Sequence, residues 1–373
     1  MNRGFWDKLE KPIFALAPMA NVTDAAFRRI IAKYGKPDVM WTEFVSADGL
    51  CSAGREKLLI DLEYSEAERP IVAQLFGAHP ERIEEAAALV ARLGFDGLDI
   101  NMGCPDRAVE KQGAGAALMK NPKLAQEVIR AAKRGAPQLP ISVKTRIGYK
   151  KNELAEWLPA LIETELAAII IHARTRAEMS KVPARWETVR EAMEIAEKMS
   201  KELRPLILGN GDVETLLQAE ERVKETGADG AMIGRGIFGN PWFFSRDSND
   251  SRGSRGSMTP TTEEKLAVML EHTRAFEEFY GPSTRLRASP EAYTRRFCGV
   301  SKKPYFALRA SKGNDTPVKK TGGRWIKGFS VMKKHYKAYA NGFSGASALR
   351  AKLMLAKDPD EVEKIVRAEY PNG

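Results

Sequence analysis

The sequence has few cysteines, and their spacing excludes two classes of protein. Only three occur in 373 residues, Cys51, Cys104 and Cys298, far apart and without a Cys-x-x-Cys pair. Zinc ribbons and small disulfide-bonded domains depend on closely spaced cysteines, so neither fits this chain. Isolated thiols suit a reducing compartment, and we therefore expect a cytoplasmic protein without a bound metal.

Long apolar runs are also missing. No uninterrupted stretch of about eighteen apolar residues occurs, which argues against a transmembrane helix. The first residues, Met1 to Lys8, lack the apolar core of a signal peptide. We expect no association with a membrane.

Acidic residues are scarce in the C-terminal third. Residues 1–244 have 34 Lys and Arg against 35 Asp and Glu, a balance of −1, whereas residues 245–373 have 25 against 14, a balance of +11. The whole net charge of +10 therefore comes from the second part. Within it, residues 285–337 contain 15 basic residues and only two acidic ones, Glu291 and Asp315.

Residues able to stack on bases are interleaved with these charges: Tyr293, Phe297, Tyr305, Phe306, Trp325, Phe329 and Tyr336. A polyanion with exposed bases fits this composition better than a small acidic metabolite does. The alternative is a basic surface that only aids solubility. The composition favours nucleic acid as a partner.

Short β-type runs alternate with helical patterns along the first two thirds of the chain. The eight candidate strands are residues 13–17, 39–43, 71–75, 97–100, 141–145, 168–171, 206–208 and 231–233. The candidate helices are residues 23–34, 80–93, 122–134, 153–163, 186–199 and 213–226, and the connection 45–68 is indistinct. This alternation predicts an α/β fold, a (β/α)8 TIM barrel. A doubly wound sheet would want a glycine-rich fingerprint after the first strand, where Ala17-Pro18-Met19-Ala20 stands instead.

Composition divides the chain into three parts. Residues 1–244 form the expected barrel, residues 245–260 read as a flexible linker rich in Ser, Gly and Arg, and residues 261–373 form a smaller, basic and mostly helical domain. Helical patterns in the last part cover residues 263–280, 344–356 and 358–367. Between them lies the basic stretch 285–337.

Cys104 stands between Gly103 and Pro105, directly after the apolar run 97–100. The turn residues aim its thiol at the carboxyl end of a strand, where barrels keep their chemistry. Three interpretations stay open: a buried structural thiol, a nucleophile or a general acid. No Cys-His-Asn or Ser-His-Asp constellation is evident locally. An acid needs a carbanion to protonate, which a flavin hydride delivered to a conjugated pyrimidine would generate.

The loops after the last two strands predict a phosphate site. Gly209, Gly211, Gly234 and Gly236 let backbone N–H groups approach an anion, and Arg235 adds charge. Barrels commonly hold phosphate at this place. Tight turns that need glycine are the alternative explanation.

Four polar residues follow the ends of other strands: Gln74, Asn101, Lys144 and His172. A lysine at a strand end can stabilise an anionic reduced flavin ring, and a glutamine can pair with its pyrimidine-like edge. His172 alone could be a structural histidine. Together the four residues favour a polar cofactor site.

The chain resembles the tRNA-dihydrouridine synthases. The resemblance covers residues 13–244 and rests on motifs in the family's order: Ala17-Pro18-Met19, Val72-Ala73-Gln74-Leu75, Asp99-Ile100-Asn101-Met102-Gly103-Cys104-Pro105, Val143-Lys144-Thr145-Arg146, Ile171-His172-Ala173-Arg174-Thr175-Arg176, Gly209-Asn210-Gly211-Asp212 and Gly234-Arg235-Gly236. It continues weakly through Gly342-Phe343-Ser344-Gly345-Ala346 to Leu349-Arg350, as in the family's C-terminal helical domain.

The resemblance implies a TIM barrel that binds FMN and a helical domain that binds tRNA. It implies an oxidoreductase acting on a CH–CH group, in which NADPH reduces FMN, hydride passes to carbon 6 of a uracil, and Cys104 protonates carbon 5. Positions that match cofactor contacts are Pro18, Met19, Gln74, Lys144, His172, Asn210, Gly211, Asp212, Gly234 and Arg235. Positions that match substrate contacts are Asn101, Arg174 and Arg176. We expect a monomer.

The basic stretch 285–337 departs from the family, because it is longer than the connection expected before the final helices. Two alternatives remain. A dihydroorotate-dehydrogenase-like enzyme, acting on a free pyrimidine with FMN, could use the same cysteine but gives no reason for the basic third. A non-enzymatic RNA-binding protein would leave the polar strand ends without a purpose.

Overall fold

The computed structural model describes residues 2–199, 204–245, 260–282 and 325–370. Eight parallel strands form one sheet, in the order β1-β8-β7-β6-β5-β4-β3-β2. Their bounds are β1 Ile13–Leu16, β2 Met40–Ser46, β3 Ile71–Phe76, β4 Gly97–Met102, β5 Ile141–Arg146, β6 Ala168–His172, β7 Leu206–Asn210 and β8 Gly230–Ile233. Ala15 bridges Val39, and the Leu16 N–H donates to the Val39 carbonyl at 3.0 Å, which closes the sheet. The predicted TIM barrel is confirmed.

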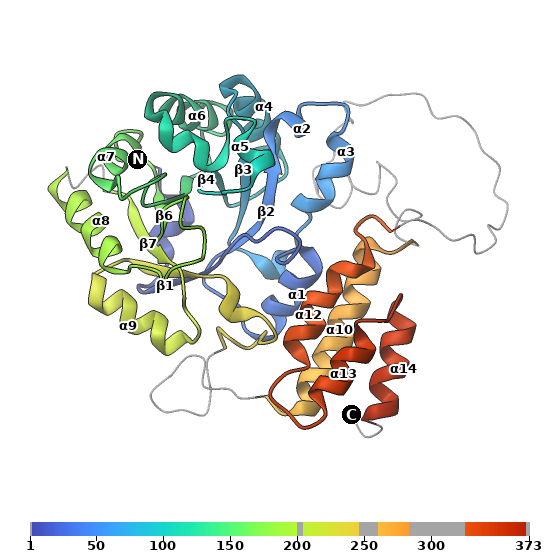
Figure 1. The fold of residues 1–373 in the computed structure, drawn as a ribbon. Helices are drawn as coiled ribbons and strands as arrows, with labels where there is room; N and C mark the ends of the chain where they lie inside the picture. Colours follow the sequence, from blue (N-terminus) through green and yellow to red (C-terminus); the bar gives the residue numbers. More distant parts are fainter. Residues whose placement is uncertain (1, 200–203, 246–259, 283–324, 371–373) are drawn as a thin grey trace, which may run out of the picture.

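Helices connect the strands and cover the outside of the barrel (Figure 1). The main ones are α1 Ala25–Tyr34, α4 Pro80–Arg92, α6 Pro122–Gly135, α7 Leu154–Ile162, α8 Glu187–Lys198 and α9 Leu216–Thr226. The indistinct connection after β2 contains α2 Ala47–Leu50, α3 Arg55–Leu58, η2 Leu59–Leu62 and η3 Glu66–Glu68. The loop after β4 contains α5 Arg107–Glu110 and η4 Gly115–Lys120, and η5 Arg235–Ile237 follows β8.

Local sequence signals explain where the helices begin. The Asp24 carboxylate accepts the Phe27 N–H at 3.0 Å and caps α1. The Asn121 side chain accepts the Leu124 N–H at 3.2 Å at the start of α6, where Pro122 occupies the first turn. Such caps satisfy N–H groups that a helix leaves unpaired.

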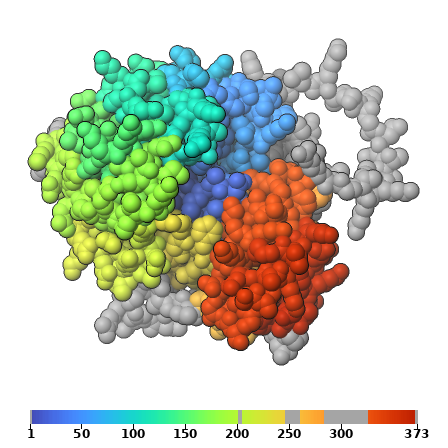
Figure 2. Space-filling model, in the orientation of Figure 1, coloured from blue at the N-terminus to red at the C-terminus, as the bar shows by residue number. Residues whose placement is uncertain are grey.

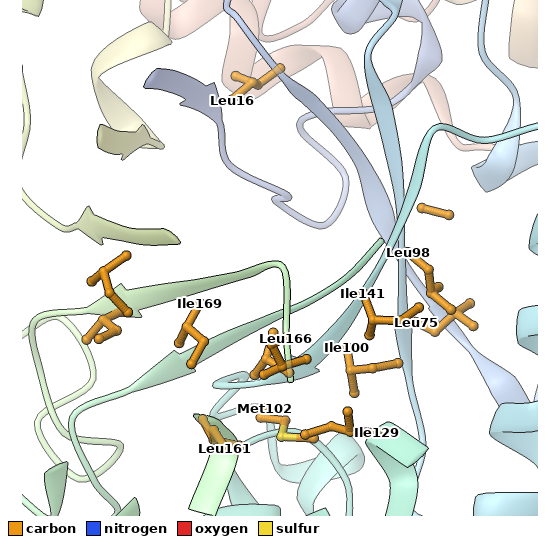
Figure 3. Packing of buried hydrophobic residues seen from close by; sticks show 14 of the residues in the cluster. Leu16, Leu75, Leu98, Ile100, Met102, Ile129, Ile141, Leu161, Leu166 and Ile169 are labelled. Atoms are coloured by element: carbon orange, nitrogen blue, oxygen red, sulfur yellow. The ribbon is translucent and has the colours of Figure 1, made fainter. Parts of the chain in front are cut away.

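Successive side chains of each strand point alternately outward, to the helices, and inward, to the barrel interior. The protein therefore has an outer and an inner core. Leu98, Ile100 and Met102 of β4 face the surrounding helices, and Figure 3 shows Ile100 and Met102 near Ile129 of α6. The inward side chains of the lower barrel are apolar and pack with Trp6 of η1 (Gly4–Lys8): Ile13, Trp41, Val72, Ile170, Leu208 and Met232. Because this layer fills the barrel floor, the inward polar residues lie above it, toward the carboxyl ends of the strands.

Helices of the C-terminal region pack against one side of the barrel, beside α1 (Figures 1 and 2). Their bounds are α10 Thr262–Tyr280, α12 Met332–Tyr339, α13 Ala346–Leu353 and α14 Pro359–Glu369, with η7 Phe329–Val331 before α12. The Ala25 N–H donates to the Tyr280 hydroxyl at 3.1 Å across this contact.

The helix α12 was not predicted, because it lies at the end of the basic stretch and has three lysines in eight residues. Its buried face consists of Met332, His335, Tyr336 and Tyr339, which have helical spacing but few aliphatic side chains. The predicted linker 245–260 falls almost wholly outside the described residues, as does most of the basic stretch. None of the helices in the described ranges has the length and hydropathy that spanning a bilayer requires.

Candidate active site

Inward-facing polar side chains gather at the carboxyl ends of the strands. The strand register places Asn101 beside Lys144, Arg146 beside His172, and His172 beside Asn210. These neighbours come from four consecutive strands, β4 to β7. The structure therefore brings most of the predicted site residues to one mouth of the barrel, as the closure of a parallel sheet requires.

Cys104 lies in the loop directly after β4. The Gly103 and Cys104 N–H groups donate to the Asn101 Oδ1 at 3.1 and 2.9 Å, which fixes the backbone at the thiol. Burial raises the pKa of the Cys104 thiol, against the opposing influence of the nearby Arg146 and Lys144 cations. A raised pKa keeps the thiol protonated at neutral pH, which suits a proton donor better than a thiolate nucleophile.

The mouth has a surplus of positive charge. The Lys144 ammonium donates to the Asn210 Oδ1 at 3.0 Å, and burial, followed by the repulsion of Arg146, lowers the pKa of Lys144 to about 8. Burial also lowers the pKa of Arg146 to about 10. The pKa of His172 lies well below its ordinary value, because burial and four neighbouring cations disfavour its charged form. Such a set of groups suits an anionic ligand.

The Asp212 carboxylate forms ion pairs with two arginines of this region. It pairs with Arg174, and the Arg235 Nη2 lies 2.8 Å from its Oδ1. The Ala184 N–H donates to its Oδ2 at 2.8 Å. Asp212 was predicted as a cofactor contact, and in the structure its carboxylate orients Arg174 and Arg235.

The four glycines of the predicted phosphate site occupy two kinds of position. A Cβ at Gly209 would lie 2.2 Å from the Trp186 ring, so this glycine is required by packing. Gly211 has φ of +125°, and a Cβ there would lie 2.8 Å from that of Ala184. Gly234 differs, since its nearest neighbour would be the Met19 Sδ at 3.5 Å. Gly236 is also required by packing, because a Cβ there would lie 2.4 Å from the Val213 carbonyl oxygen. Of the four glycines, Gly234 alone would accept a Cβ without a clash, and an anion contact at these loops stays a prediction.

The loop between β1 and α1 contains Pro18 and Met19 and places the Met19 sulfur against Gly234. The Met19 N–H donates to the Thr23 Oγ1 at 2.8 Å, and the Met19 carbonyl accepts the Val22 N–H at 3.0 Å. Glu43 of β2 accepts the Asn21 N–H. These bonds hold the loop in one conformation.

Gln74 and Asn101 are bonded to each other. The Asn101 Nδ2 donates to the Gln74 Oε1 at 3.0 Å, and the Gln74 Nε2 donates to the Asp99 Oδ2 at 2.7 Å. Gln74 is fully buried. Gln74 was predicted to contact the cofactor and Asn101 to contact the substrate, and both roles stay predictions.

Arg174 and Arg176 follow β6 and were predicted to contact the substrate. The Arg174 Nε donates to the Val182 carbonyl at 2.6 Å. The Arg176 Nε lies 2.9 Å from both carboxylate oxygens of Glu110 on α5. Arg176 therefore ties the loop after β6 to the segment that follows Cys104.

Sequence reasoning did not assign a role to Asp99, Ser142 or Arg146, although all three have the inward parity of their strands. The Arg146 guanidinium donates to the Gly103 carbonyl at 2.8 Å and to the Met179 carbonyl at 2.9 Å. Counting alternate residues back from Asn101 and Lys144 would have identified Asp99 and Ser142. The alternation of inward and outward side chains along each strand is the sequence signal that identifies these residues.

Comparison with known proteins gives a consistent result. Residues 15–320 match the family model described as dihydrouridine synthase. "Probable tRNA-dihydrouridine synthase 2" of Bacillus subtilis (strain 168) is 34% identical over 368 residues, which cover 98% of this chain and 96% of that protein. "Probable tRNA-dihydrouridine synthase" of Staphylococcus aureus (strain COL) is 38% identical over 309 residues, 81% of this chain and 90% of that protein.

Proposed function

The chain belongs to the dihydrouridine synthase family, and from this premise we propose that it reduces specific uridines of tRNA to 5,6-dihydrouridine, with FMN as cofactor and NADPH as reductant. The observation that carries the proposal is a protonated thiol, Cys104, held at a barrel mouth with surplus positive charge. Bound FMN, once reduced by NADPH, supplies the hydride for carbon 6 of the uracil.

The residues at the mouth fit FMN by their chemistry. Lys144 and Arg235 supply cationic donors for anionic groups, and Asn210 fixes Lys144 in place. The neutral His172 and the loop of Pro18 and Met19 complete the contacts that the family resemblance assigns, together with Gln74, Gly211, Asp212 and Gly234. Charge-assisted hydrogen bonds of this kind are the stronger ones in proteins.

Cys104 gives the proton to carbon 5. Its raised pKa keeps the proton on sulfur until the substrate demands it, and the nearby Arg146 and Lys144 stabilise the thiolate that remains. The target uridine has to leave its stack to reach the mouth, which costs a few kcal/mol and favours uridines in loops. Asn101, Arg174 and Arg176 are the proposed substrate contacts.

The basic C-terminal part, residues 261–373, binds the tRNA backbone in this account, while residues 1–244 form the catalytic domain and residues 245–260 link the two. The +11 charge balance of residues 245–373 supports a polyanionic substrate. We place the reaction in the cytoplasm and take the enzyme to act as a monomer without a metal.

The test is to incubate purified protein with FMN, NADPH and unmodified tRNA, and to map dihydrouridine by nuclease digestion and mass spectrometry. We expect new dihydrouridine at one or a few positions, with a rate that decreases steeply as salt increases. Salt-insensitive turnover of free uracil or orotate without a tRNA product would instead support a small-molecule pyrimidine oxidoreductase. Tight tRNA binding without NADPH consumption would support an RNA-binding protein without activity.

A further inference from the structure

A buried chain of side-chain hydrogen bonds runs through the barrel and ends at Cys104. We refer to Ser142, Asp99, Gln74 and Asn101 together as the buried relay. The Ser142 hydroxyl donates to the Asp99 Oδ1 at 2.5 Å, and the Gln74 Nε2 donates to the Asp99 Oδ2 at 2.7 Å. The Asn101 Nδ2 donates to the Gln74 Oε1 at 3.0 Å, and the Asn101 Oδ1 accepts the N–H groups of Gly103 and Cys104.

The strand register supports these contacts. Asp99 of β4 lies directly beside Gln74 of β3 and directly beside Ser142 of β5. Asp99 and Asn101 are two residues apart on one strand, so their side chains point to the same, inner face. Ser142, Asp99 and Gln74 therefore lie at one depth on three neighbouring strands, and Asn101 lies two residues nearer the carboxyl end of β4.

The carboxylate gives the relay its direction. An amide side chain can present its oxygen or its NH2 group to a neighbour, whereas an ionised carboxylate only accepts. Next to Asp99, Gln74 has to present its NH2 group, which leaves its oxygen for the Asn101 NH2 group. The Asn101 oxygen is then free for the two backbone N–H groups. Reversing Gln74 would turn the Asn101 NH2 group against them.

Asp99 is costly at this place, which argues that its acceptor character matters. It is fully buried, and burial raises its pKa to about 6 against the opposing hydrogen bonds of Ser142 and Gln74 and the nearby charge of Lys144. Burying a carboxylate is unfavourable, and the raised pKa shows that these interactions offset only part of the cost. An apolar side chain would pack here at lower cost but would not fix the orientation of Gln74.

We propose that Asp99 is a positioning residue, which holds the backbone of Cys104 by setting the orientation of Gln74 and Asn101. Asp99 itself touches neither the thiol nor the Cys104 backbone in these contacts. The inference rests on the proposed function only in taking Cys104 as the proton donor. Holding the Gly103–Cys104 backbone keeps the thiol partly buried and near the Arg146 and Lys144 cations.

The test uses a cycle of three variants, Asp99→Asn, Ser142→Ala and the double variant. In Asp99→Asn alone, the new amide can present its oxygen to Gln74 and its NH2 group to the Ser142 hydroxyl, which can accept as well as donate. The relay then survives. Ser142→Ala is the matched control, because it removes one hydrogen bond at the same depth and leaves Asp99 as an acceptor. In the double variant the amide at position 99 has lost the Ser142 hydroxyl, so either of its orientations leaves its oxygen or its NH2 group unpaired.

The readout is the alkylation rate of Cys104 by iodoacetamide in the FMN-bound protein without tRNA or NADPH, followed by peptide mass spectrometry. Cys51, which is also free, serves as the internal reference. We expect each single variant to alter the Cys104 rate less than about threefold, and the double variant to accelerate it about tenfold with the Cys51 rate unchanged. The rate constant for single-turnover reduction of tRNA should decrease in the double variant, while the tRNA concentration that gives half the maximal rate stays the same.

If the double variant leaves the Cys104 rate within about twofold of the wild type, or accelerates Cys51 equally, the positioning role is wrong. If the double variant does not fold, Gln74→Met cuts the same relay with a side chain of similar volume. Because Gln74 is also a proposed FMN contact, this variant is compared with the wild type in the absence of FMN, and the same selective acceleration is expected. Because alkylation is measured without the reaction, it reports on Asp99 even if the chain proves not to reduce tRNA.

Discussion

At the scale of single residues, burial decides the behaviour of the Cys104 thiol. Burial raises its pKa, so the thiolate is a minor form at neutral pH. The alkylation rate of Cys104 should therefore keep increasing above pH 10, where an ordinary thiol with a pKa of about 8.5 has nearly reached its limit. Glutathione under the same conditions is the control. A rate that levels off below pH 8 would show an activated thiolate and contradict the role of acid.

Lys144 is the second residue whose environment indicates its role. Its pKa is lowered to about 8, and Asn210 is its hydrogen-bond partner within the described residues. Replacing it in Lys144→Met should raise the dissociation constant of FMN at pH 7 by about tenfold or more, since a charge-assisted hydrogen bond contributes about 1.5–3 kcal/mol. Fluorescence titration measures this. The exposed Lys123 on α6 provides the control variant Lys123→Met, and equal affinities in both variants would argue against the assigned site.

At the scale of elements, two histidines pack between the barrel and the C-terminal helices. His272 of α10 and His335 of α12 are fully buried, their rings 4.6 Å apart beside Phe27 of α1. Neither nitrogen of His335 has a hydrogen-bond partner among the described residues. Burial lowers the pKa of His335 to about 3. The contact of α10 and α12 with α1 therefore requires a neutral ring.

This burial makes the stability of the protein depend on pH. A histidine with an unfolded pKa of about 6.5 and a lowered folded pKa contributes fully above pH 6.5, and its contribution is lost as pH decreases toward 3. Between pH 7 and pH 5 we expect a loss of about 2 kcal/mol from His335. His335→Leu should remove this part of the loss in urea denaturation. An identical loss in both proteins would contradict the buried neutral state.

The elements were predictable to different degrees. Each strand starts within one residue of its predicted position, because β-type runs after turn residues are a local signal. Several strands end later than predicted, since inward polar residues such as Asn101 and Asn210 still belong to the ladder. The contacts of Gln74 with Asp99 and of Arg176 with Glu110 were not predictable, because they join residues 25 and 66 positions apart. Only the closed barrel brings them together.

At the scale of the whole molecule, Lys327 joins the C-terminal region to the barrel. Its ammonium pairs with Glu43 of β2 and lies 2.8 Å from the Asp61 Oδ1, and its side chain is only 12% exposed. Glu43 also accepts the N–H of Asn21, in the loop that follows Met19. The attachment of the helices and the conformation of the proposed cofactor loop therefore share one carboxylate.

Removing Lys327 should weaken the whole assembly. Lys327→Met leaves the buried carboxylate of Glu43 and the partly buried carboxylate of Asp61 without their cation. We therefore expect the free energy of unfolding to decrease by about 3 kcal/mol. Adding Glu43→Gln removes one of these carboxylates and should restore part of the loss. Urea denaturation of the two variants measures the difference. If the double variant is less stable than Lys327→Met, the ion pair does not have the role assigned here.

In the proposed mechanism, Cys104 supplies a proton to a uridine of tRNA at this barrel mouth. The most direct measurement is the single-turnover rate of dihydrouridine formation, with reduced FMN already bound, in the wild type and in Cys104→Ala. We predict the same FMN content in both proteins and a rate at least about a hundredfold lower in the variant, as for loss of a general acid. Dihydrouridine formed by Cys104→Ala at the wild-type rate would contradict the account.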